Sequence, residues 1–229
     1  MDIRHAYIEQ GSGEPLILLH GNGESKEYFE HQIPFFAKEY RVIALDTRGH
    51  GETPKGKKPF RLWQFAEDLK EFMDEKGIGR AHLLGFSDGG NIALIFALKY
   101  PEKVRSLILN GANIFPKGMA EPMYSQIVAA YERNKEALPE HPEKQDRFDM
   151  LALMAEEPHI RPEELKELKM PALVVAGTED AITEEHTRLI AENIPGAELV
   201  FIEGDHYIAH EKPAEFNRAA AAFLSRQNG

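Results

Sequence analysis

Ser87 is the residue of this 229-residue chain whose surroundings most strongly suggest chemistry. It lies in the stretch GFSDGG, between Gly85 and Gly89, after the apolar run AHLLGF and before DGGNIALIFALKY, which has the composition of a helix. A strand that turns sharply into a helix exposes a serine hydroxyl at the start of that helix, where backbone N–H groups favour a developing negative charge. Glycines on both sides leave room for so tight a turn. The pattern predicts a nucleophilic serine.

A serine hydroxyl needs a base to accept its proton and an acidic group to orient that base. In the GxSxG arrangement these partners follow the serine in the order acid, then histidine. Asp180 comes just after the apolar run ALVVAG, and His206 follows the later run ELVFIEG. Both positions lie at the carboxyl ends of predicted strands, where the sites of open α/β sheets form. We predict that Ser87, Asp180 and His206 are the catalytic residues.

Neighbouring side chains offer alternatives for the acid and the base. Glu179 precedes Asp180 directly, but its longer side chain is expected to be solvated. Asp205 adjoins His206, and the side chains of adjacent residues usually diverge. His210 is the alternative base, although the EKP that follows it already leads into the last predicted helix. The sequence favours Asp180 and His206.

Two glycine-containing loops follow the first two buried runs. In HGNGES, the turn at His20 is predicted to present the backbone N–H of Asn22 to an oxyanion, together with the N–H of Asp88. A flexible turn without such a role is the alternative interpretation. In DTRGHGET, the glycines are expected to shape a tight loop, and we assign Arg48 and His50 structural rather than chemical roles.

The elements that would position these residues alternate between short apolar runs and longer amphipathic ones. Continuous apolar strands separated by helices are typical of a mostly parallel sheet that is covered on both faces. The amino-terminal IRHAYIEQ alternates between apolar and polar residues, which favours an antiparallel edge strand. The predicted fold class is therefore α/β, a central sheet with helices on both faces in a single domain.

One segment interrupts this alternation. Residues 113–169 contain no convincing strand but two predicted helices, at 121–138 and 144–156, separated by PEHPEK. The segment is too long for a simple connection, so we predict a small helical cap inserted into a core of residues 1–112 and 170–229. Its methionines suit a flexible apolar pocket wall, and packing of the cap onto the core explains them as well. The residues predicted to contact substrate are Asp88, Phe115, Met119, Met123 and Met154.

Composition and charge argue against several classes of function. The net charge of −11 and the pI of about 5.4 disfavour nucleic acid as a partner, and the absence of Cys excludes disulfides, thiolate catalysis and Cys–zinc sites. No HExxH motif is present and no phosphate-binding glycine loop follows a strand, so we predict no metal and no cofactor. The polar start MDIRHAYIEQ and the lack of a long apolar stretch predict a cytoplasmic protein that does not bind membranes. The expected partner is a small molecule, and the chain is expected to be a monomer or a dimer.

The remaining histidines receive no chemical role. His82 lies within a predicted strand and is expected in the core. The others are expected at the surface: His5, His31, His141, His159 and His186.

The motifs HGNGES, DTRGHG, GFSDGG, AGTED and EGDH occur together in this order, each after its predicted strand. From about Ile3 to the closing helix, the chain resembles the α/β-hydrolase superfamily. Within it, GFSDGGNIALIFALKYPEKV and HGNGES are similar to the biphenyl-hydrolase-like serine esterases of the valacyclovir-hydrolase type, which carry an aspartate directly after the nucleophile. The resemblance implies a serine-ester mechanism with Ser87 as nucleophile, Asp180 as acid and His206 as base. It also implies a short helical cap after the sixth strand.

The motifs leave the reaction and the role of Asp88 open. Ester hydrolysis through an acyl-enzyme is the leading hypothesis. The same triad also serves carbon–carbon bond hydrolysis, lyase or synthase chemistry and perhydrolysis, and some proteins of this fold are small-molecule receptors. Asp88 either complements the dipole of the helix that it begins or attracts the amine of a substrate such as an α-amino ester. A bare carboxylate beside a forming oxyanion would oppose catalysis unless a cation offset it.

Overall fold

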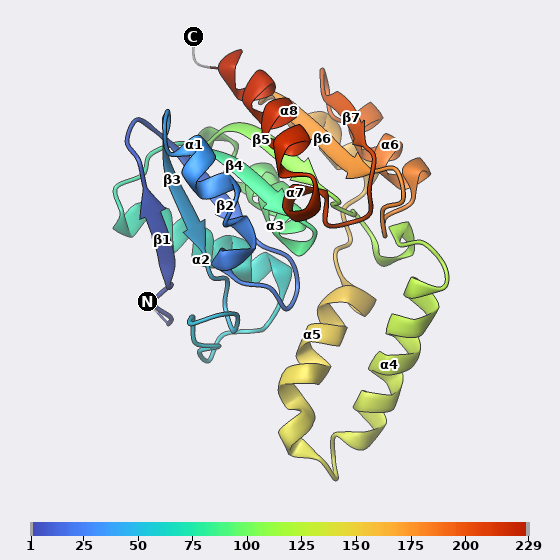
Figure 1. Cartoon of the computed structure of the whole chain (residues 1–229). Coiled ribbons are helices and arrows are strands. Elements are labelled where there is room, and N and C mark those ends of the chain that lie inside the picture. Colours follow the sequence, from blue (N-terminus) through green and yellow to red (C-terminus); the bar gives the residue numbers. More distant parts are fainter. Residues whose placement is uncertain (1, 228–229) are drawn as a thin grey trace.

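A seven-stranded sheet forms the centre of the computed structural model, which describes residues 2–227 (Figure 1). The strands lie in the order β1-β3-β2-β4-β5-β6-β7. As the sequence predicts, the amino-terminal strand pairs antiparallel at the edge, and the other pairings are parallel. The strands are β1 (Tyr7–Gln10), β2 (Glu14–Leu19), β3 (Tyr40–Leu45), β4 (Ala81–Phe86), β5 (Val104–Asn110), β6 (Ala172–Gly177) and β7 (Glu198–Ile202).

Helices cover both faces of the sheet (Figure 1). The α-helices are α1 (Gln32–Phe36), α2 (Leu62–Glu75), α3 (Asp88–Lys99), α4 (Met123–Ala137), α5 (Gln145–Glu156), α6 (Glu184–Asn193), α7 (Ile208–Glu211) and α8 (Pro213–Ser225). Short 3-10 helices lie in the connections: η1 (Lys26–Phe29), η2 (Pro101–Lys103), η3 (Pro116–Gly118), η4 (Pro142–Lys144) and η5 (Pro162–Glu167). Among residues 2–227, none of these helices is long and apolar enough to cross a membrane.

The inner strands contribute alternate side chains to two apolar cores, one on each face. In β2, Ile17 and Leu19 belong to the core shared with α2, α3 and α6, whereas Leu16 and Leu18 belong to the core shared with α1, α7 and α8. Successive side chains of a strand point to opposite faces. A strand buried on both faces therefore needs a continuous apolar run, which is the signal that the sequence carries.

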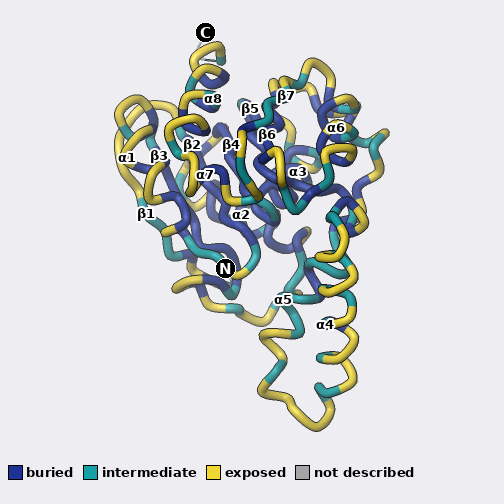
Figure 2. Tube along the Cα trace, turned by 45° about the vertical axis from the view of Figure 1, so that its right-hand side comes forward, coloured by how far each residue is buried: buried dark blue, intermediate teal, exposed yellow. Residues whose placement is uncertain are grey.

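The segment between β5 and β6 leaves the sheet and carries α4 and α5, which lie side by side (Figure 1). The helices predicted at 121–138 and 144–156 are confirmed, with bounds that differ by no more than two residues. In chain order the insertion follows the fifth strand, not the sixth, because a single antiparallel strand precedes the parallel set. The far end of the insertion is exposed (Figure 2).

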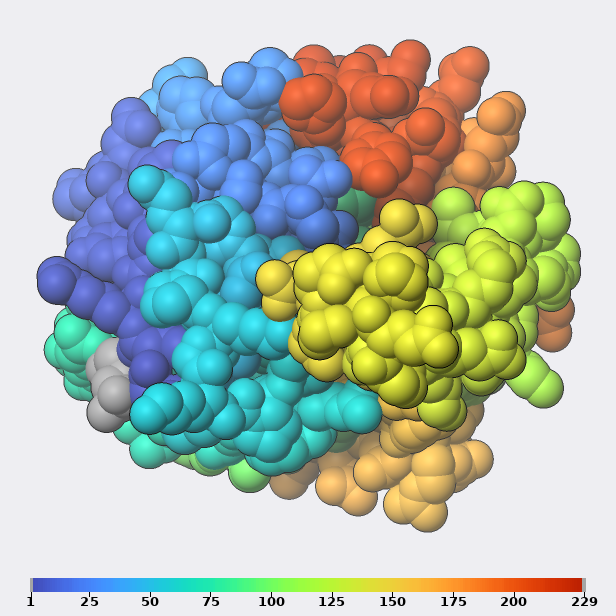
Figure 3. All heavy atoms as spheres, turned by 90° about the horizontal axis from the view of Figure 1, so that it is seen from below, coloured from blue at the N-terminus to red at the C-terminus, as the bar shows by residue number. Residues whose placement is uncertain are grey.

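The insertion lies on the side of the sheet to which the parallel strands point (Figure 1). Seen from below, α4 and α5 cover part of this face, and a recess is visible where they meet the amino-terminal and carboxyl-terminal parts of the chain (Figure 3). The loops after β2, β4, β6 and β7 open toward the same face, so the fold gathers the predicted site residues there.

The histidines confirm the sequence-based expectation only in part. His82 is buried in β4, where its Nδ1 is hydrogen-bonded to the Ser106 hydroxyl at 2.8 Å. His5 and His186 were expected at the surface but are buried. The first residues of the insertion pack onto α6 and cover His186, whose Nε2 accepts a hydrogen bond from the Ile114 N–H at 2.9 Å. Ile114 and His186 are far apart in the sequence, so the pattern of apolar and polar residues within α6 does not indicate this contact.

Candidate active site

Ser87 occupies the sharp turn between β4 and α3. Its backbone has φ 54° and ψ −120°, and it is the one non-glycine residue with positive φ among residues 2–227. Such a conformation costs about 1–3 kcal/mol, which the surrounding structure must offset. A Cβ at Gly85 would lie 2.2 Å from the Gly89 carbonyl oxygen, and one at Gly89 would lie 2.0 Å from that of Leu19. The two glycines are therefore required by close backbone approach on both sides of the serine.

Asp180 and His206 are brought together beside this turn. Nδ1 of His206 donates a hydrogen bond to Oδ1 of Asp180 at 2.7 Å. The carboxylate is held in place because it also accepts the N–H of Ile182 at 2.9 Å and that of Gly177 at 3.1 Å. Its side chain is 2% exposed, against 14% for that of His206. A buried carboxylate that is held by three hydrogen bonds is suited to orienting an imidazole.

Gly111, at the end of β5, makes room for this pair. Its φ is +59°, and a Cβ there would lie 2.7 Å from Cε1 of His206 and 3.4 Å from Oδ2 of Asp180. Any larger residue would push the histidine out of its position. Gly111, the glycine of the NGAN stretch, is therefore required because His206 and Asp180 occupy the space that a side chain would need.

The alternative acids and base lie elsewhere. Glu179 and Asp205 are exposed, and Asp205 accepts the N–H of Tyr207 at 2.7 Å instead of contacting the imidazole. His210 lies at the surface, where its Nδ1 is 3.8 Å from the Glu30 carboxylate. The geometry therefore brings together the three residues that the sequence favours.

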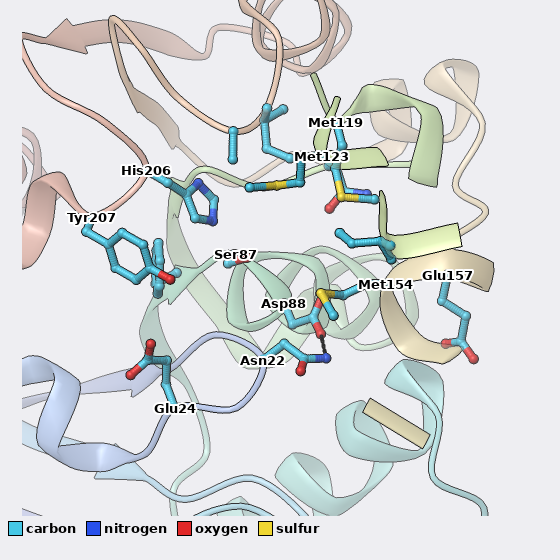
Figure 4. A pocket seen from close by; sticks show the side chains of 15 residues that line it. Asn22, Glu24, Ser87, Asp88, Met119, Met123, Met154, Glu157, His206 and Tyr207 are labelled. Atoms are coloured by element: carbon cyan, nitrogen blue, oxygen red, sulfur yellow. Dashed lines mark hydrogen bonds between the residues drawn. The ribbon is translucent and has the colours of Figure 1, made fainter. Parts of the chain in front are cut away.

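Ser87 and His206 line the same pocket, and in the view of Figure 4 the imidazole lies above the serine. The Ser87 hydroxyl forms no hydrogen bond with any of the described residues. Hydrogen bonds between a nucleophile and its base are commonly loose before substrate binds. Phe86 packs against the His206 ring, with 4.8 Å between ring centroids, and so limits how far the ring can turn.

The loop after β2 holds Asn22 opposite the start of α3. Thr47 donates its N–H to Nε2 of His20 at 3.0 Å, so the proton of this neutral ring is on Nδ1, which donates to the Gly21 carbonyl at 2.8 Å. Burial lowers the pKa of His20 to about 4, which keeps the ring neutral. Within the described part of the chain, the backbone N–H groups of Asn22 and Asp88 donate to no acceptor. Both residues line the pocket.

Asp88 is buried, and its carboxylate bonds to two amide side chains. Oδ2 accepts from Nδ2 of Asn22 at 3.0 Å, and Oδ1 accepts from Nδ2 of Asn91 at 3.3 Å. Burial raises the pKa of Asp88, and the two amide donors and the nearby His206 oppose that rise. Two of about four acceptor positions on the carboxylate remain for other donors.

The pocket has a volume of about 250 Å³ and is mostly apolar. Met119, Met123 and Met154, predicted from the sequence, line it together with Ile127 and Ile182. Phe115 does not line this pocket. Its ring packs edge-on against His186, 4.5 Å between centroids, and borders a separate depression on α6.

The pocket residues that the sequence did not anticipate include three with ionisable side chains: Glu24, Glu157 and Tyr207. Glu157 lies where the insertion returns to the core, and its carboxylate accepts the N–H of Leu62 at 2.9 Å. Burial raises its pKa, and the charge of Asp88 adds to that rise. Figure 4 shows Glu24, Asp88 and Glu157 on different sides of the pocket. Glu24 lies within HGNGES, but that motif gives no sign that the glutamate reaches the pocket, and Glu157 belongs to no motif. Only the folded chain brings both glutamates to the site.

Comparison with known proteins agrees with this geometry. A family model for the α/β hydrolase fold matches residues 14–163. The chain belongs to the α/β-hydrolase family. It is 31% identical over 261 aligned positions to 2-hydroxy-6-oxo-6-phenylhexa-2,4-dienoate hydrolase of Comamonas testosteroni, covering 96% of this chain and 91% of the relative. It is 28% identical to 3-oxoadipate enol-lactonase 2 of Acinetobacter baylyi, over 99% and 94% of the two chains.

Among solved structures, this α/β-hydrolase resembles a thermophilic esterase from Thermogutta terrifontis, with a TM-score of 0.80 and 26% identity over 99% of this chain and 95% of the esterase. The two relatives and this structural neighbour are a hydrolase, a lactonase and an esterase, and the chain is an enzyme of the α/β-hydrolase family. Outside the pocket, the exposed side chains of Glu30, His31 and His210 bring metal-type ligand atoms within 4.8 Å of one another.

Proposed function

We propose that this α/β-hydrolase cleaves small carboxylic esters through an acyl-enzyme on Ser87. The observation that carries the proposal is the Asp180–His206 hydrogen bond beside the strained Ser87 turn, with Ser87 and His206 lining one pocket. Ser87 Oγ attacks the ester carbonyl while its proton passes to Nε2 of His206. The C–O bond to the alcohol then breaks, and the alkoxide takes that proton from the imidazolium. Water, deprotonated by His206, then attacks the acyl carbon. The bond between that carbon and Ser87 Oγ breaks, Oγ takes the proton back from His206, and the carboxylic acid leaves.

The developing oxyanion is proposed to bind the backbone N–H groups of Asn22 and Asp88. Both residues line the pocket, and neither N–H has an acceptor among residues 2–227. The N–H of Asp88 lies at the start of α3, where the helix dipole favours negative charge. Loss of one donor of this kind typically costs about 3–4 kcal/mol in the transition state.

The charge of the pocket favours neutral or amine-bearing esters over anionic ones. Glu24, Asp88 and Glu157 line it, and none of the described lining residues is Lys or Arg. The free acceptor positions of Asp88 suit the ammonium group of an α-amino ester. That cation would also offset the carboxylate beside the oxyanion. Met119, Met123 and Met154 would contact the apolar part of such a substrate.

Carbon–carbon bond or lactone hydrolysis is the second candidate, because the two curated relatives carry a dienoate hydrolase and an enol-lactonase name. The dienoate and oxoadipate of those names are carboxylates. A carboxylate-bearing substrate would enter this pocket without a cationic partner, at an electrostatic cost. The pocket charge therefore ranks ester hydrolysis first.

A substrate panel separates these candidates. It contains p-nitrophenyl esters of increasing chain length, α-amino ethyl esters, hemisuccinate esters, an enol-lactone and a dienoate. The expected order of kcat/KM is α-amino and neutral esters above anionic ones. Ser87→Ala is the matched control and should abolish turnover of every substrate. Unchanged activity in Ser87→Ala would reject the mechanism, and a preference for the dienoate or the lactone would favour the second candidate.

The amine interaction has its own test. Asp88→Asn removes the charge but keeps an amide oxygen as acceptor. It should lower kcat/KM for α-amino esters several-fold more than for neutral esters of the same acyl length. An equal loss on both substrates would count against binding of the amine by Asp88.

A further inference from the structure

A chain of hydrogen-bonded side chains crosses the floor of the pocket and reaches the insertion. It begins at Asn22, whose amide nitrogen uses both of its protons. One is donated to Oδ2 of Asp88 at 3.0 Å, and the other to the carbonyl of Met150, in α5, at 3.1 Å. A single side chain thus connects the loop after β2, the start of α3 and the insertion (Figure 4 shows the bond to Asp88).

Asn91 continues the chain from Asp88 to the other end of the insertion. Its Nδ2 donates to Oδ1 of Asp88 at 3.3 Å and to Oδ1 of Asn113 at 2.9 Å. Its Oδ1 accepts the N–H of Asn113 at 2.9 Å, and the amide of Asn113 donates to the Phe115 carbonyl at 3.1 Å. Asn91 is fully buried. The insertion is therefore tied to the catalytic turn both where it leaves the core and at α5.

A buried network of side-chain hydrogen bonds is rigid only while each of its donors and acceptors has a partner. Truncating Asn22 would leave Oδ2 of Asp88 and the Met150 carbonyl without this donor, which is unfavourable for each group that stays buried. Asp88 and Asn22 are also the residues whose backbone N–H groups form the proposed oxyanion hole. The hydrogen bond between the Asn22 and Asp88 side chains therefore restrains the distance between these two backbone N–H groups.

We propose that Asn22 and Asn91 are positioning residues, which hold Asp88 from both sides and thereby couple the seating of the insertion to the alignment of the oxyanion donors. The proposal rests on the proposed function, because it assigns the N–H groups of Asn22 and Asp88 to the oxyanion. It gives Asp88 a role through its hydrogen bonds, whatever the charge of the substrate. Neither asparagine side chain touches the reacting atoms; both act through Asp88 and the backbone.

A double-mutant cycle with a neutral p-nitrophenyl ester tests this coupling. Asn22→Ala and Asp88→Ala should each lower kcat about 10- to 100-fold, the size of effect that a small misplacement of catalytic groups produces, with KM changed far less. Because both changes break the same hydrogen bond, the kcat of the double variant should be no lower than that of the less active single variant. Asp88→Asn, which keeps an acceptor for Asn22, should recover part of the kcat lost in Asp88→Ala. Multiplicative losses in the double variant, or no recovery with asparagine, would overturn the proposal.

Backbone hydrogen exchange supplies a readout that does not depend on activity. Asn22 is only partly buried, so Asn22→Ala should fold, and exchange of the α5 amides near Met150 should become faster. Asn134→Ala is the matched control: it removes an amide that bonds the Ala130 carbonyl within α4, away from the pocket, and should leave both kcat and α5 exchange unchanged. Unchanged α5 exchange in Asn22→Ala would refute the tie to the insertion. If the wild-type chain hydrolyses no ester, the proposed function fails, and this exchange result still decides whether the tie exists.

Discussion

Asp180 and His206 are 26 positions apart in the sequence, yet Oδ1 of the aspartate accepts a hydrogen bond from Nδ1 of the histidine at 2.7 Å. The carboxylate is an acceptor, so the ring proton lies on Nδ1 and Nε2 is free to accept a proton from Ser87. The backbone N–H groups of Gly177 and Ile182 also donate hydrogen bonds to this carboxylate. The pair is therefore oriented before any substrate binds.

Asp180→Asn should lower kcat by about 10³–10⁴-fold, because an asparagine can stabilise the wrong tautomer of His206 and cannot stabilise the imidazolium. The measurement is steady-state kinetics with the best ester of the panel. Asp205→Asn is the matched control, since Asp205 is next to His206 in sequence but contacts the Tyr207 N–H, and it should change kcat by no more than a few-fold. Comparable losses in the two variants would contradict the assignment of the acid.

Gly89→Ala should destabilise the protein, because the new Cβ would lie 2.0 Å from the Leu19 carbonyl oxygen in the centre of the sheet. Overpacking of this kind costs about 1–3 kcal/mol or more, measured as a fall in the free energy of unfolding in urea. Gly79→Ala is the control, since a Cβ there has no neighbour within 4 Å. It should stay within about 0.5 kcal/mol of the wild type. Equal stability of the two variants would show that the turn can relax.

Arg48→Met should cost about 3–5 kcal/mol of stability, because it leaves the buried carboxylate of Asp68 without a cation, with the Gln64 amide as its remaining hydrogen-bond donor. The Arg48 side chain is fully buried and bonds both oxygens of Asp68 at 2.7 Å, as well as Asp2. This geometry agrees with the structural role predicted from the sequence. Arg226→Ala removes an exposed ion pair with Glu198 and should cost no more than about 1 kcal/mol. Urea denaturation of both variants checks the difference, and similar losses would argue against a structural role for Arg48.

His186→Gln should make stability less sensitive to acid. Burial lowers the pKa of His186 from 6.5 to about 4, so the folded chain keeps the ring neutral while the unfolded chain takes up a proton as the pH falls below about 6.5. Unfolding is then favoured between about pH 6.5 and 4, and the stability due to the neutral ring is fully present above that window. Glutamine can still accept the Ile114 N–H but does not titrate. The stability difference between the wild type and the variant should be constant above pH 7 and shift in favour of the variant toward pH 4.5. A difference independent of pH would contradict the prediction.

The sequence predicts the architecture well because its signals are local. Apolar runs bounded by glycines indicate strands buried on both faces, and the break after Gly111 indicates an insertion of two helices. The carboxyl ends of parallel strands necessarily meet at one edge, so Ser87, Asp180 and His206 could be placed there from their positions after three predicted strands.

The contact between Asp88 and Asn22 could not be predicted in the same way. Asn22 donates to the Asp88 carboxylate from the loop after β2, Glu24 lines the pocket from the same loop, and Glu157 lines it from the end of the insertion. Phe115 was predicted to contact substrate but packs on His186, which was predicted to be exposed. Each of these outcomes depends on which faces of distant elements meet, and hydrogen-bonding or burial at such contacts leaves no periodic trace in the chain. The sequence by itself determined the fold, the order of the motifs that carry Ser87, Asp180 and His206, and the edge of the sheet where they gather. Only the tertiary structure decided what surrounds Ser87, because charge and polarity in the pocket come from long-range packing.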